Sequence, residues 1–251
     1  MDGKVVVVTG ASGGIGAALA ELVGRRGGRP VLAARREPEL HQVAARSGPQ
    51  ALPVVADVTR RDQVRRILDV AIARFGHIDV WVNNAGRGIT RPVSALTDED
   101  FDAMMRVNVL SALYGMQAVL PHFQERGRGH IINVSSMLGR IPFVPARSAY
   151  SAAKHALNAL TASLRLELRE RWPEIHVSTI SPGVVATEFG NHALWGGPDS
   201  RQLPHTQPVE EVAEVIAGVI VHPRDEAYTR AGMQQQVVDY FGVREQGDRD
   251  G

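Results

Sequence analysis

Short runs of branched apolar residues alternate with longer amphipathic stretches over most of this chain of 251 residues. Apolar runs of this length are typical of strands, and a helical period is typical of helices. Strands are expected over residues 4–9, 30–34, 51–56, 78–82, 130–135 and 176–181. Helices are expected over 14–27, 37–46, 60–75, from 98 onward, through 110–124, near 148–171 and after Pro208. Such an alternation admits few architectures other than a sheet with helices packed against it.

The order of these elements predicts a doubly wound α/β fold, in which a mostly parallel Rossmann sheet of six to seven strands carries helices on both faces. The runs 5–8 and 80–82 lack a period of two, as expected for parallel strands that are buried on both faces. No linker rich in Pro, Gly or Ser divides the chain, so we expect a single domain over residues 1–243. Residues 188–208 are irregular, and the polar segment 244–251 is expected to be a disordered tail.

The composition excludes several kinds of protein. The chain has no cysteine, which rules out disulfides, iron–sulfur clusters and a cysteine nucleophile. Its formal net charge of +1 offers no excess of positive charge for nucleic acid. No apolar run reaches the roughly 18 residues of a membrane span. The nine histidines show no metal-ligand spacing, so no metal is expected. Because the first residues lack the pattern of a signal peptide, we expect a soluble cytoplasmic protein.

Lysine is rare in this chain, because only Lys4 and Lys154 among 28 basic residues are not arginine. Lys154 follows Tyr150 by four residues in an expected helix, so the two side chains share a helix face. A positive charge about 4 Å from a phenol favours the phenolate by roughly 4 kcal/mol at an effective dielectric constant near 20, or up to about 3 pKa units before desolvation opposes it. We therefore expect Lys154 to lower the pKa of Tyr150 towards the range of a proton-transfer group. In an arbitrary helix this spacing is more often a surface pair, but the rarity of lysine favours a functional role.

Glycines follow the first expected strand, in the segment 9–16 that reads Thr-Gly-Ala-Ser-Gly-Gly-Ile-Gly. A doubly wound sheet binds its ligand beyond this point, where glycines let a pyrophosphate approach the backbone and the helix N-terminus offers free N–H groups. A plain strand–turn–helix connection is the alternative, since the spacing differs from the general dinucleotide fingerprint.

Arg35 and Arg36 end the second expected strand, where an NAD site usually carries an acid. A guanidinium binds a 2′-phosphate well, so NADP(H) is favoured over NAD(H), unless both arginines are simply solvated.

These features occur in a fixed order with several others. The order is Thr9-Gly10-x-x-x-Gly14-Ile15-Gly16, Asp57-Val58, Asn83-Asn84-Ala85-Gly86, Asn108, Ser135-Ser136, Tyr150-x-x-x-Lys154 and Pro182-Gly183-x-x-x-Thr187. As a set, the motifs resemble the short-chain dehydrogenase/reductase family, in its single-domain branch whose chains have this length. The resemblance runs from about residue 4 to residue 187 and, more loosely, through the helix after Pro208. It implies an NADP(H)-dependent oxidoreductase that acts on CH–OH and C=O groups.

The resemblance implies a catalytic set of Asn108, Ser136, Tyr150 and Lys154. Tyr150 would be the general acid and base, and Lys154 would lower the phenol pKa and bind the nicotinamide ribose. Ser136 would donate a hydrogen bond to the substrate oxygen, and Asn108 would hold a water that links Lys154 to solvent. Ser135 stays an alternative to Ser136, which is preferred because it lies further towards the exit of the strand.

The resemblance also implies a cofactor site made of the glycine turn, the two arginines and the loops after the third, fourth and sixth strands. Its residues are Gly10, Ser12, Gly14, Ile15, Gly16, Arg35, Arg36, Asp57, Val58, Asn84, Ala85, Gly86, Tyr150, Lys154, Pro182, Gly183, Val185 and Thr187. Asp57 and Val58 would contact the adenine, and the segment 182–187 would hold the nicotinamide carboxamide.

In the family, the segment that corresponds to 188–208 covers the substrate, so a flexible lid is expected there. Apolar residues in this lid and after the serines suggest a small-molecule carbonyl or alcohol that is apolar or bulky, although packing of the loop alone would explain them too. The family is commonly dimeric or tetrameric, so a homodimer or homotetramer is expected, with no nucleic acid or membrane partner.

Two other functions stay open. The first is a catalytically silent NADP(H)-binding sensor or scaffold on the same fold, since a fold does not determine a function. The intact set of Asn108, Ser136, Tyr150 and Lys154 argues against it, because a sensor needs no proton-transfer groups. The second is an epimerase or dehydratase, whose chains usually carry a separate substrate domain.

Overall fold

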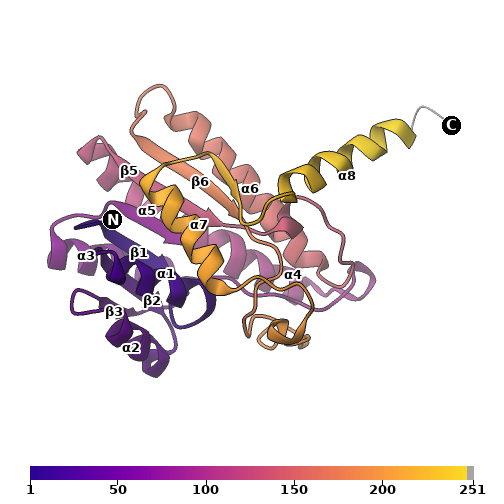
Figure 1. The fold of residues 1–251 in the computed structure, drawn as a ribbon, viewed down its shortest axis with the longest axis horizontal. Helices are drawn as coiled ribbons and strands as arrows, with labels where there is room; N and C mark the ends of the chain where they lie inside the picture. The colour runs from indigo at the N-terminus through magenta and orange to yellow at the C-terminus, as the bar shows by residue number, and fades with distance from the viewer. Residues whose placement is uncertain (248–251) are drawn as a thin grey trace.

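The computed structural model describes residues 1–247, of which residues 243–247 are described by their backbone alone. Within them, seven strands form one parallel sheet in the order β3-β2-β1-β4-β5-β6-β7, with helices on both faces (Figure 1). The strands are β1 (Val5–Thr9), β2 (Arg29–Ala34), β3 (Leu52–Val55), β4 (Val80–Asn83), β5 (Gly129–Val134), β6 (Ile175–Ser181) and β7 (Glu226–Tyr228). The helices are α1 (Gly14–Arg25), α2 (Glu37–Arg46), α3 (Arg61–Phe75), α4 (Asp98–Met105), α5 (Ser111–Arg126), α6 (Ser148–Leu168), α7 (Val209–Val221) and α8 (Met233–Gly247). The predicted fold class is confirmed.

The strand order reverses between β1 and β4. The chain moves outward from β1 through β2 to β3, then returns to β4 and moves outward again through β5, β6 and β7. Doubly wound sheets bind their ligands outside the carboxyl ends of the strands at this reversal. The segments that follow β1 and β4 therefore position the site.

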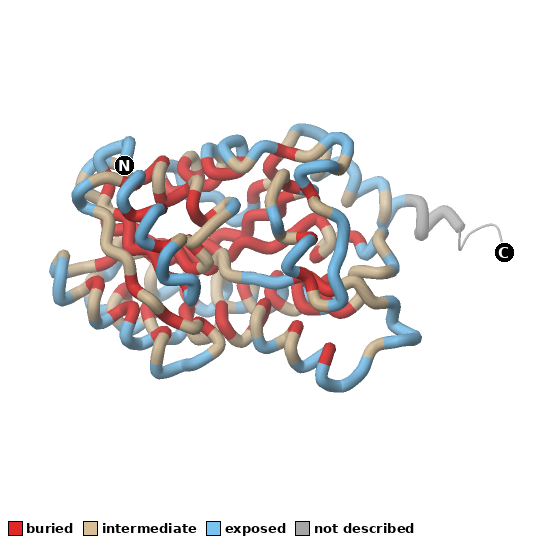
Figure 2. Tube along the Cα trace, turned by 90° about the horizontal axis from the view of Figure 1, so that it is seen from below, coloured by how far each residue is buried: buried red, intermediate tan, exposed pale blue. Residues whose placement is uncertain are grey.

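Two apolar layers enclose the sheet. Val6 and Val8 of β1 pack against residues of α1, α2 and α7, whereas Val5 and Val7 pack on the other face against residues of α3, α5 and α6. All four valines are fully buried, and the middle of the molecule is coloured as buried in Figure 2. Burial on both faces explains why this run shows no alternation in the sequence.

The last helix is the main element that the sequence pattern did not indicate. α8 extends away from the body of the molecule (Figure 1), and its residues Val238 and Phe241 are exposed. Because α8 has no apolar stripe that faces a core, its sequence carries no helical period. The helix continues to Gly247, four residues into the segment 244–251 that was expected to be disordered. Residues 248–251 lie outside the described residues.

Candidate functional site

A cavity of about 860 Å³ lies at the carboxyl ends of β1, β4, β5 and β6. It is lined by most of the residues that the sequence proposes for catalysis and cofactor binding, namely Gly10, Ser12, Gly14, Ile15, Arg36, Asn84, Ala85, Gly86, Ser136, Tyr150, Lys154, Pro182, Gly183, Val185 and Thr187. The other proposed residues, Gly16, Arg35, Asp57, Val58 and Asn108, are outside the lining. The fold therefore gathers motifs that are spread over the chain into one hollow.

The glycine turn after β1 is shaped by close approaches of the backbone. Gly10 has a φ of +68°, and a Cβ atom on it would lie 2.8 Å from the Cα atom of Ala85. A Cβ atom on Gly16 would lie 2.5 Å from the carbonyl oxygen of Gly10, so Gly16 lets α1 pack against the turn. No side chain caps the N-terminus of α1, and its first turn carries no acid. Its first N–H groups can therefore bind an anion such as a pyrophosphate.

Thr9 and Asn84 join this turn to the loop after β4. The Thr9 hydroxyl accepts hydrogen bonds from the backbone N–H groups of Asn84, at 3.0 Å, and Ala85, at 3.1 Å. The amide nitrogen of Asn84 donates to the carbonyl oxygen of Thr9 at 2.9 Å. Thr9 is buried, so these bonds are sheltered from water and fix the two loops relative to each other.

The two arginines after β2 differ in their placement. The Arg36 guanidinium lies over the glycine turn, where Nε donates to Ser12 Oγ at 3.2 Å and Nη2 donates to the Ser12 carbonyl oxygen at 3.3 Å. Arg35 is exposed and does not line the cavity. Of this pair, Arg36 is therefore the cation that lies beside the proposed cofactor site.

Asp57 stabilises the turn that leads into α3, and Val58 packs in the core. The Asp57 carboxylate accepts hydrogen bonds from the N–H group and the hydroxyl of Thr59, at 2.9 and 2.8 Å. Val58 packs into the apolar layer under α3. Adenine contact by these two residues stays a prediction, since neither side chain lines the cavity.

Tyr150 lies in the first turn of α6 and interacts with Ser136, which directly follows β5 and Ser135. Burial raises the pKa of Tyr150 to about 12, and hydrogen bonding with the Ser136 hydroxyl acts in the opposite direction. The Ser135 hydroxyl donates instead to the carbonyl oxygen of Lys154 at 3.5 Å. The structure therefore brings Ser136, rather than Ser135, to the phenol.

Lys154 lies one helical turn after Tyr150, but its ammonium group hydrogen-bonds elsewhere. Lys154 Nζ donates to the carbonyl oxygen of Val134 at 2.8 Å and lies 5.7 Å from the centroid of the Tyr150 ring. Burial lowers the pKa of Lys154 to about 8. The net shift of the Tyr150 pKa is opposite to the one that the spacing predicts, because desolvation of the buried phenol dominates over Ser136 and Arg147, which oppose it. A lowering of the phenol pKa by Lys154 stays a prediction.

Asn108 lies in a π-helical segment, Arg106–Leu110, that joins α4 to α5. Its amide nitrogen donates to the carbonyl oxygen of Arg87 at 3.0 Å and to the carbonyl oxygen one turn earlier at 3.1 Å. Its Oδ1 atom accepts from the N–H group of Arg87 at 3.2 Å. A Cβ atom on Gly86 would lie 2.8 Å from this oxygen and 3.6 Å from Lys154 Nζ. Asn108 thus clamps the loop that passes Lys154, and both of its amide hydrogens are already used.

The segment 188–208 is held by contacts with other loops. Leu194 pairs through backbone hydrogen bonds with the loop after β4. The Trp195 indole donates to Asp100 at 2.8 Å, and the Arg91 guanidinium lies 4.0 Å from the Trp195 ring centroid. Trp195 has a φ of +64°, so these contacts hold a left-handed backbone that tryptophan rarely adopts. The flexibility of this lid stays a prediction.

Arg147 also lines the cavity, and the sequence pattern did not single it out. It precedes Tyr150 by three residues, a spacing that places both on one side of a helix. That spacing is the signal that would have found it. The spacing does not stand out by itself, because arginine is so common in this chain that one more near Tyr150 draws no notice.

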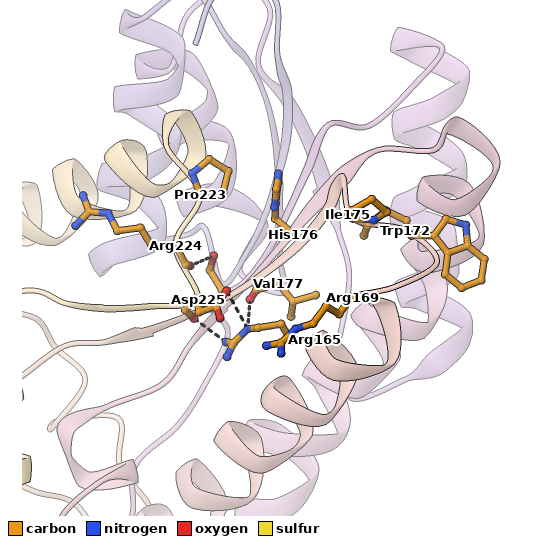
Figure 3. A pocket seen from close by; sticks show the side chains of 11 residues that line it. Arg165, Arg169, Trp172, Ile175, His176, Val177, Pro223, Arg224 and Asp225 are labelled. Atoms are coloured by element: carbon orange, nitrogen blue, oxygen red, sulfur yellow. Dashed lines mark hydrogen bonds and ion pairs between the residues drawn. The ribbon is translucent and has the colours of Figure 1, made fainter.

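A second, smaller cavity of about 220 Å³ lies at the amino end of β6, whereas the large cavity lies at the carboxyl ends of the strands (Figure 3). Arg165 donates there to the carbonyl oxygens of Val177, at 2.8 Å, and Asp225, at 2.6 Å, while Arg224 points away. No proposed site residue lies in it. Within residues 1–247, no group of three His, Asp or Glu could hold a metal ion, and no helix is long and apolar enough to cross a membrane.

Residues 4–194 match the family model of the short chain dehydrogenase. An uncharacterized oxidoreductase of Bacillus subtilis (strain 168), YxnA, is 35% identical over 248 residues, which are 96% of this chain and 68% of that protein. A short chain dehydrogenase/reductase from Burkholderia phymatum, solved in complex with NAD, is 27% identical with a TM-score of 0.88, covering 98% of this chain and 95% of that one. An alcohol dehydrogenase from Thermococcus sibiricus, complexed with 5-hydroxy-NADP, is 28% identical with a TM-score of 0.79, covering 90% and 96%.

Proposed function

Because the chain belongs to the short-chain dehydrogenase family, we propose that it is an NADP(H)-dependent oxidoreductase that interconverts a carbonyl compound and the corresponding alcohol. One observation carries the proposal. Tyr150, Ser136 and Lys154 meet in the same cavity that the glycine turn opens into. The two solved neighbours, one with NAD and one with an NADP derivative, support a nicotinamide cofactor.

The residues around the glycine turn fit a dinucleotide. Gly10 and Gly14 have positive φ angles, which other residues rarely adopt, and a Cβ atom on Gly14 would lie 3.2 Å from the methyl group of Thr187. The uncapped N-terminus of α1 offers N–H groups to the pyrophosphate. Arg36, which lies over Ser12, offers a guanidinium to a 2′-phosphate, and Arg35 adds charge beside it. The absence of an acid at the end of β2 supports NADP(H) over NAD(H).

The rest of the dinucleotide would follow the cavity towards Tyr150. Asn84, Ala85 and Gly86 would pass the ribose, and the Lys154 ammonium beside Gly86 would donate to it. The loop after β6 would hold the nicotinamide end through Pro182, Gly183, Val185 and Thr187.

In the proposed mechanism, Tyr150 delivers the proton of a carbonyl reduction. The chemistry that NADPH would supply when bound is a hydride, with its electron pair, for the carbonyl carbon. Tyr150 donates its phenolic proton to the carbonyl oxygen, and its raised pKa keeps that proton on the phenol at neutral pH. Ser136 donates a hydrogen bond to the same oxygen and stabilises the charge that develops on it. In the oxidation direction the phenol has to lose its proton first, which positive groups nearby favour.

Lys154 and Asn108 would return the proton to Tyr150. Because its pKa is about 8, Lys154 is largely charged at pH 7 and can both donate a proton and take one up close to neutral pH. Asn108 has no free amide hydrogen, so a relay water would be held by its oxygens. We also propose that the protein is cytoplasmic and, like most members of its family, forms a homodimer or homotetramer. Light scattering would contradict an oligomer if it gave a monomeric mass.

Consumption of NADPH with a panel of aldehydes and ketones tests the proposal. The wild type is expected to turn over at least one class of carbonyl. Tyr150→Phe should lower kcat by about 1,000-fold and leave the Kd of NADPH unchanged, since the phenyl ring keeps the packing but carries no proton. Equal turnover by the two proteins would contradict the mechanism. Binding of NADPH without turnover of any panel member would instead favour the catalytically silent sensor.

A further inference from the structure

Arg147 is the residue directly before α6, and its side chain enters the cavity beside the proposed catalytic groups. It precedes Tyr150 by three residues and lines the same hollow as Ser136 and Tyr150. The two side chains are close enough for the positive charge of Arg147 to lower the phenol pKa. The guanidinium therefore lies at the end of the cavity where the proposed carbonyl reacts.

The guanidinium has a prepared place between two loops. Arg147 Nη1 donates to the carbonyl oxygen of Ile89 at 3.2 Å. A Cβ atom on Gly88 would lie 2.8 Å from Nη1, and a Cβ atom on Gly197 would lie 3.1 Å from Nη2. Gly88 follows β4 and Gly197 belongs to the lid, so the guanidinium lies close against the backbone of two loops at positions that carry no side chain.

The charge of Arg147 has no carboxylate partner among the described residues. Two nearby arginines differ, because Arg91 pairs with Asp100 at 2.7 Å and Arg201 pairs with Glu188 at 3.1 Å, whereas Arg87, which is exposed, also donates to a backbone carbonyl alone. Arginine stays protonated in proteins, and Arg147 is half-buried and donates to a backbone carbonyl, that of Ile89. A partly desolvated charge without a counter-ion is costly unless a ligand supplies the opposite charge.

We propose that Arg147 binds a carboxylate of the substrate, so that the site takes oxo acids and the matching hydroxy acids. This inference rests on the proposed function and names its substrate class. A guanidinium offers two parallel N–H donors, which match the two oxygens of a carboxylate. Leu138, Val144 and Phe189 line the same part of the cavity and would contact the apolar remainder of the molecule.

Another role for Arg147 is to tune Tyr150 alone. In that case its charge would assist proton transfer for every carbonyl, whether or not the substrate is an anion. The two roles separate in a comparison of charged and neutral substrates of equal shape.

The experiment uses 2-oxo and 3-oxo acids, each with its methyl ester, and NADPH as the reductant. For the wild type, kcat/KM should favour an acid over its ester by about 100-fold, because the site is built to bind a charged group that the ester lacks. Arg147→Met should remove this preference by lowering kcat/KM for the acid about 100-fold more than for the ester, since loss of the charge beside Tyr150 affects both substrates alike. Arg147→Lys keeps the charge without the paired donors and should fall in between. Arg169→Met removes the same charge from the far end of α6 and is the matched control.

Each outcome supports or overturns the inference. Turnover of the esters and neutral ketones without a preference for any acid overturns it and leaves the proposed function intact. An equal loss for acid and ester in Arg147→Met, with a shifted pH profile of kcat, assigns Arg147 to the tuning of Tyr150 and also overturns it. If Arg147→Met does not fold, as judged by its melting temperature, the ratio measured for Arg147→Lys decides. No turnover of any panel member by the wild type overturns both the inference and the proposed function.

Discussion

On the cofactor side of the cavity, buried hydrogen bonds and close backbone approaches hold the loops, whereas on the substrate side exposed side chains help to hold the lid. The turn after β1 is fixed by Thr9 and Asn84 and by the close approach of Gly10 to Ala85. The lid 188–208 is fixed by the backbone pairing of Leu194 with the loop after β4 and by side-chain contacts such as that of Trp195 with Asp100. A change on the first side disturbs the ends of buried strands, while a change at the exposed Trp195 disturbs one contact of the lid. A chain built this way can alter its substrate while it keeps its cofactor.

The comparison is tested most severely at Gly10. Gly10→Ala places a methyl group 2.8 Å from the Cα atom of Ala85 at a φ of +68°, so the turn has to move. The Kd of NADPH should rise by about 100-fold, which corresponds to roughly 3 kcal/mol of strain. Gly218→Ala is the control, since no atom lies within 4 Å of its added methyl group. An unchanged Kd in calorimetry would contradict the rigidity that we assign to this side.

On the cofactor side, Arg36 is the side chain that we expect to decide between NADPH and NADH. Arg36→Asp should shift the ratio of the Kd values for NADPH and NADH towards NADH by about 100-fold, because a carboxylate repels a 2′-phosphate and accepts from a ribose hydroxyl. Arg35→Asp should have a smaller effect, since Arg35 does not line the cavity. A larger shift for Arg35→Asp in fluorescence titrations would show that the position over Ser12 is not the determinant.

The buried sheet on which both sides rest should lose stability in acid because of His130. Burial, followed by the charges of His176 and Lys4, lowers the pKa of His130 to about 3. The unfolded chain binds a proton at its ordinary pKa near 6.5, so it takes up a proton that the folded chain refuses as the pH falls from about 6.5 towards 3. Between pH 6.5 and 5 this costs about 2 kcal/mol of the free energy of unfolding.

Urea unfolding at pH 7 and pH 5 measures this effect. His130→Gln keeps a hydrogen-bonding side chain next to Ser178 Oγ, which lies 2.8 Å from His130 Nε2, but it cannot titrate. The loss of stability between the two pH values should be smaller in this variant by about 2 kcal/mol. Equal losses in the variant and the wild type would show that His130 does not stay neutral in the fold.

The smallest effect is expected at the lid. Trp195→Phe keeps an aromatic ring for Arg91 but removes the hydrogen bond to Asp100. A single hydrogen bond contributes about 1 kcal/mol, so the KM of the carbonyl substrate should rise only a few-fold, with the Kd of NADPH unchanged. If NADPH affinity falls while KM stays the same, the lid belongs to the cofactor side and the comparison fails.

The same division explains what could be predicted from the sequence. Strands such as β1 and the turn at Gly10 were predicted because buried backbone needs particular residues in a particular order. The difference between Arg35 and Arg36 could not be predicted, since it depends on which side chain reaches Ser12. Arg147 was missed because the feature that singles it out, a half-buried charge without a carboxylate partner, appears only in the folded structure. The direction of the Tyr150 pKa shift was missed because spacing reports a nearby charge but not the depth of burial.

The π-helical segment Arg106–Leu110 has a consequence for length variation in this chain. A π turn holds one residue more than an α-helical turn, and each residue advances a helix by about 100°. Removal of a single codon within 106–110 would give one continuous α-helix from α4 to α5. The buried residues Ala112 and Met116 would then rotate by about 100° out of the core relative to Met104. The extra residue that places Asn108 next to Gly86 is therefore also what keeps the two helices in phase with the sheet.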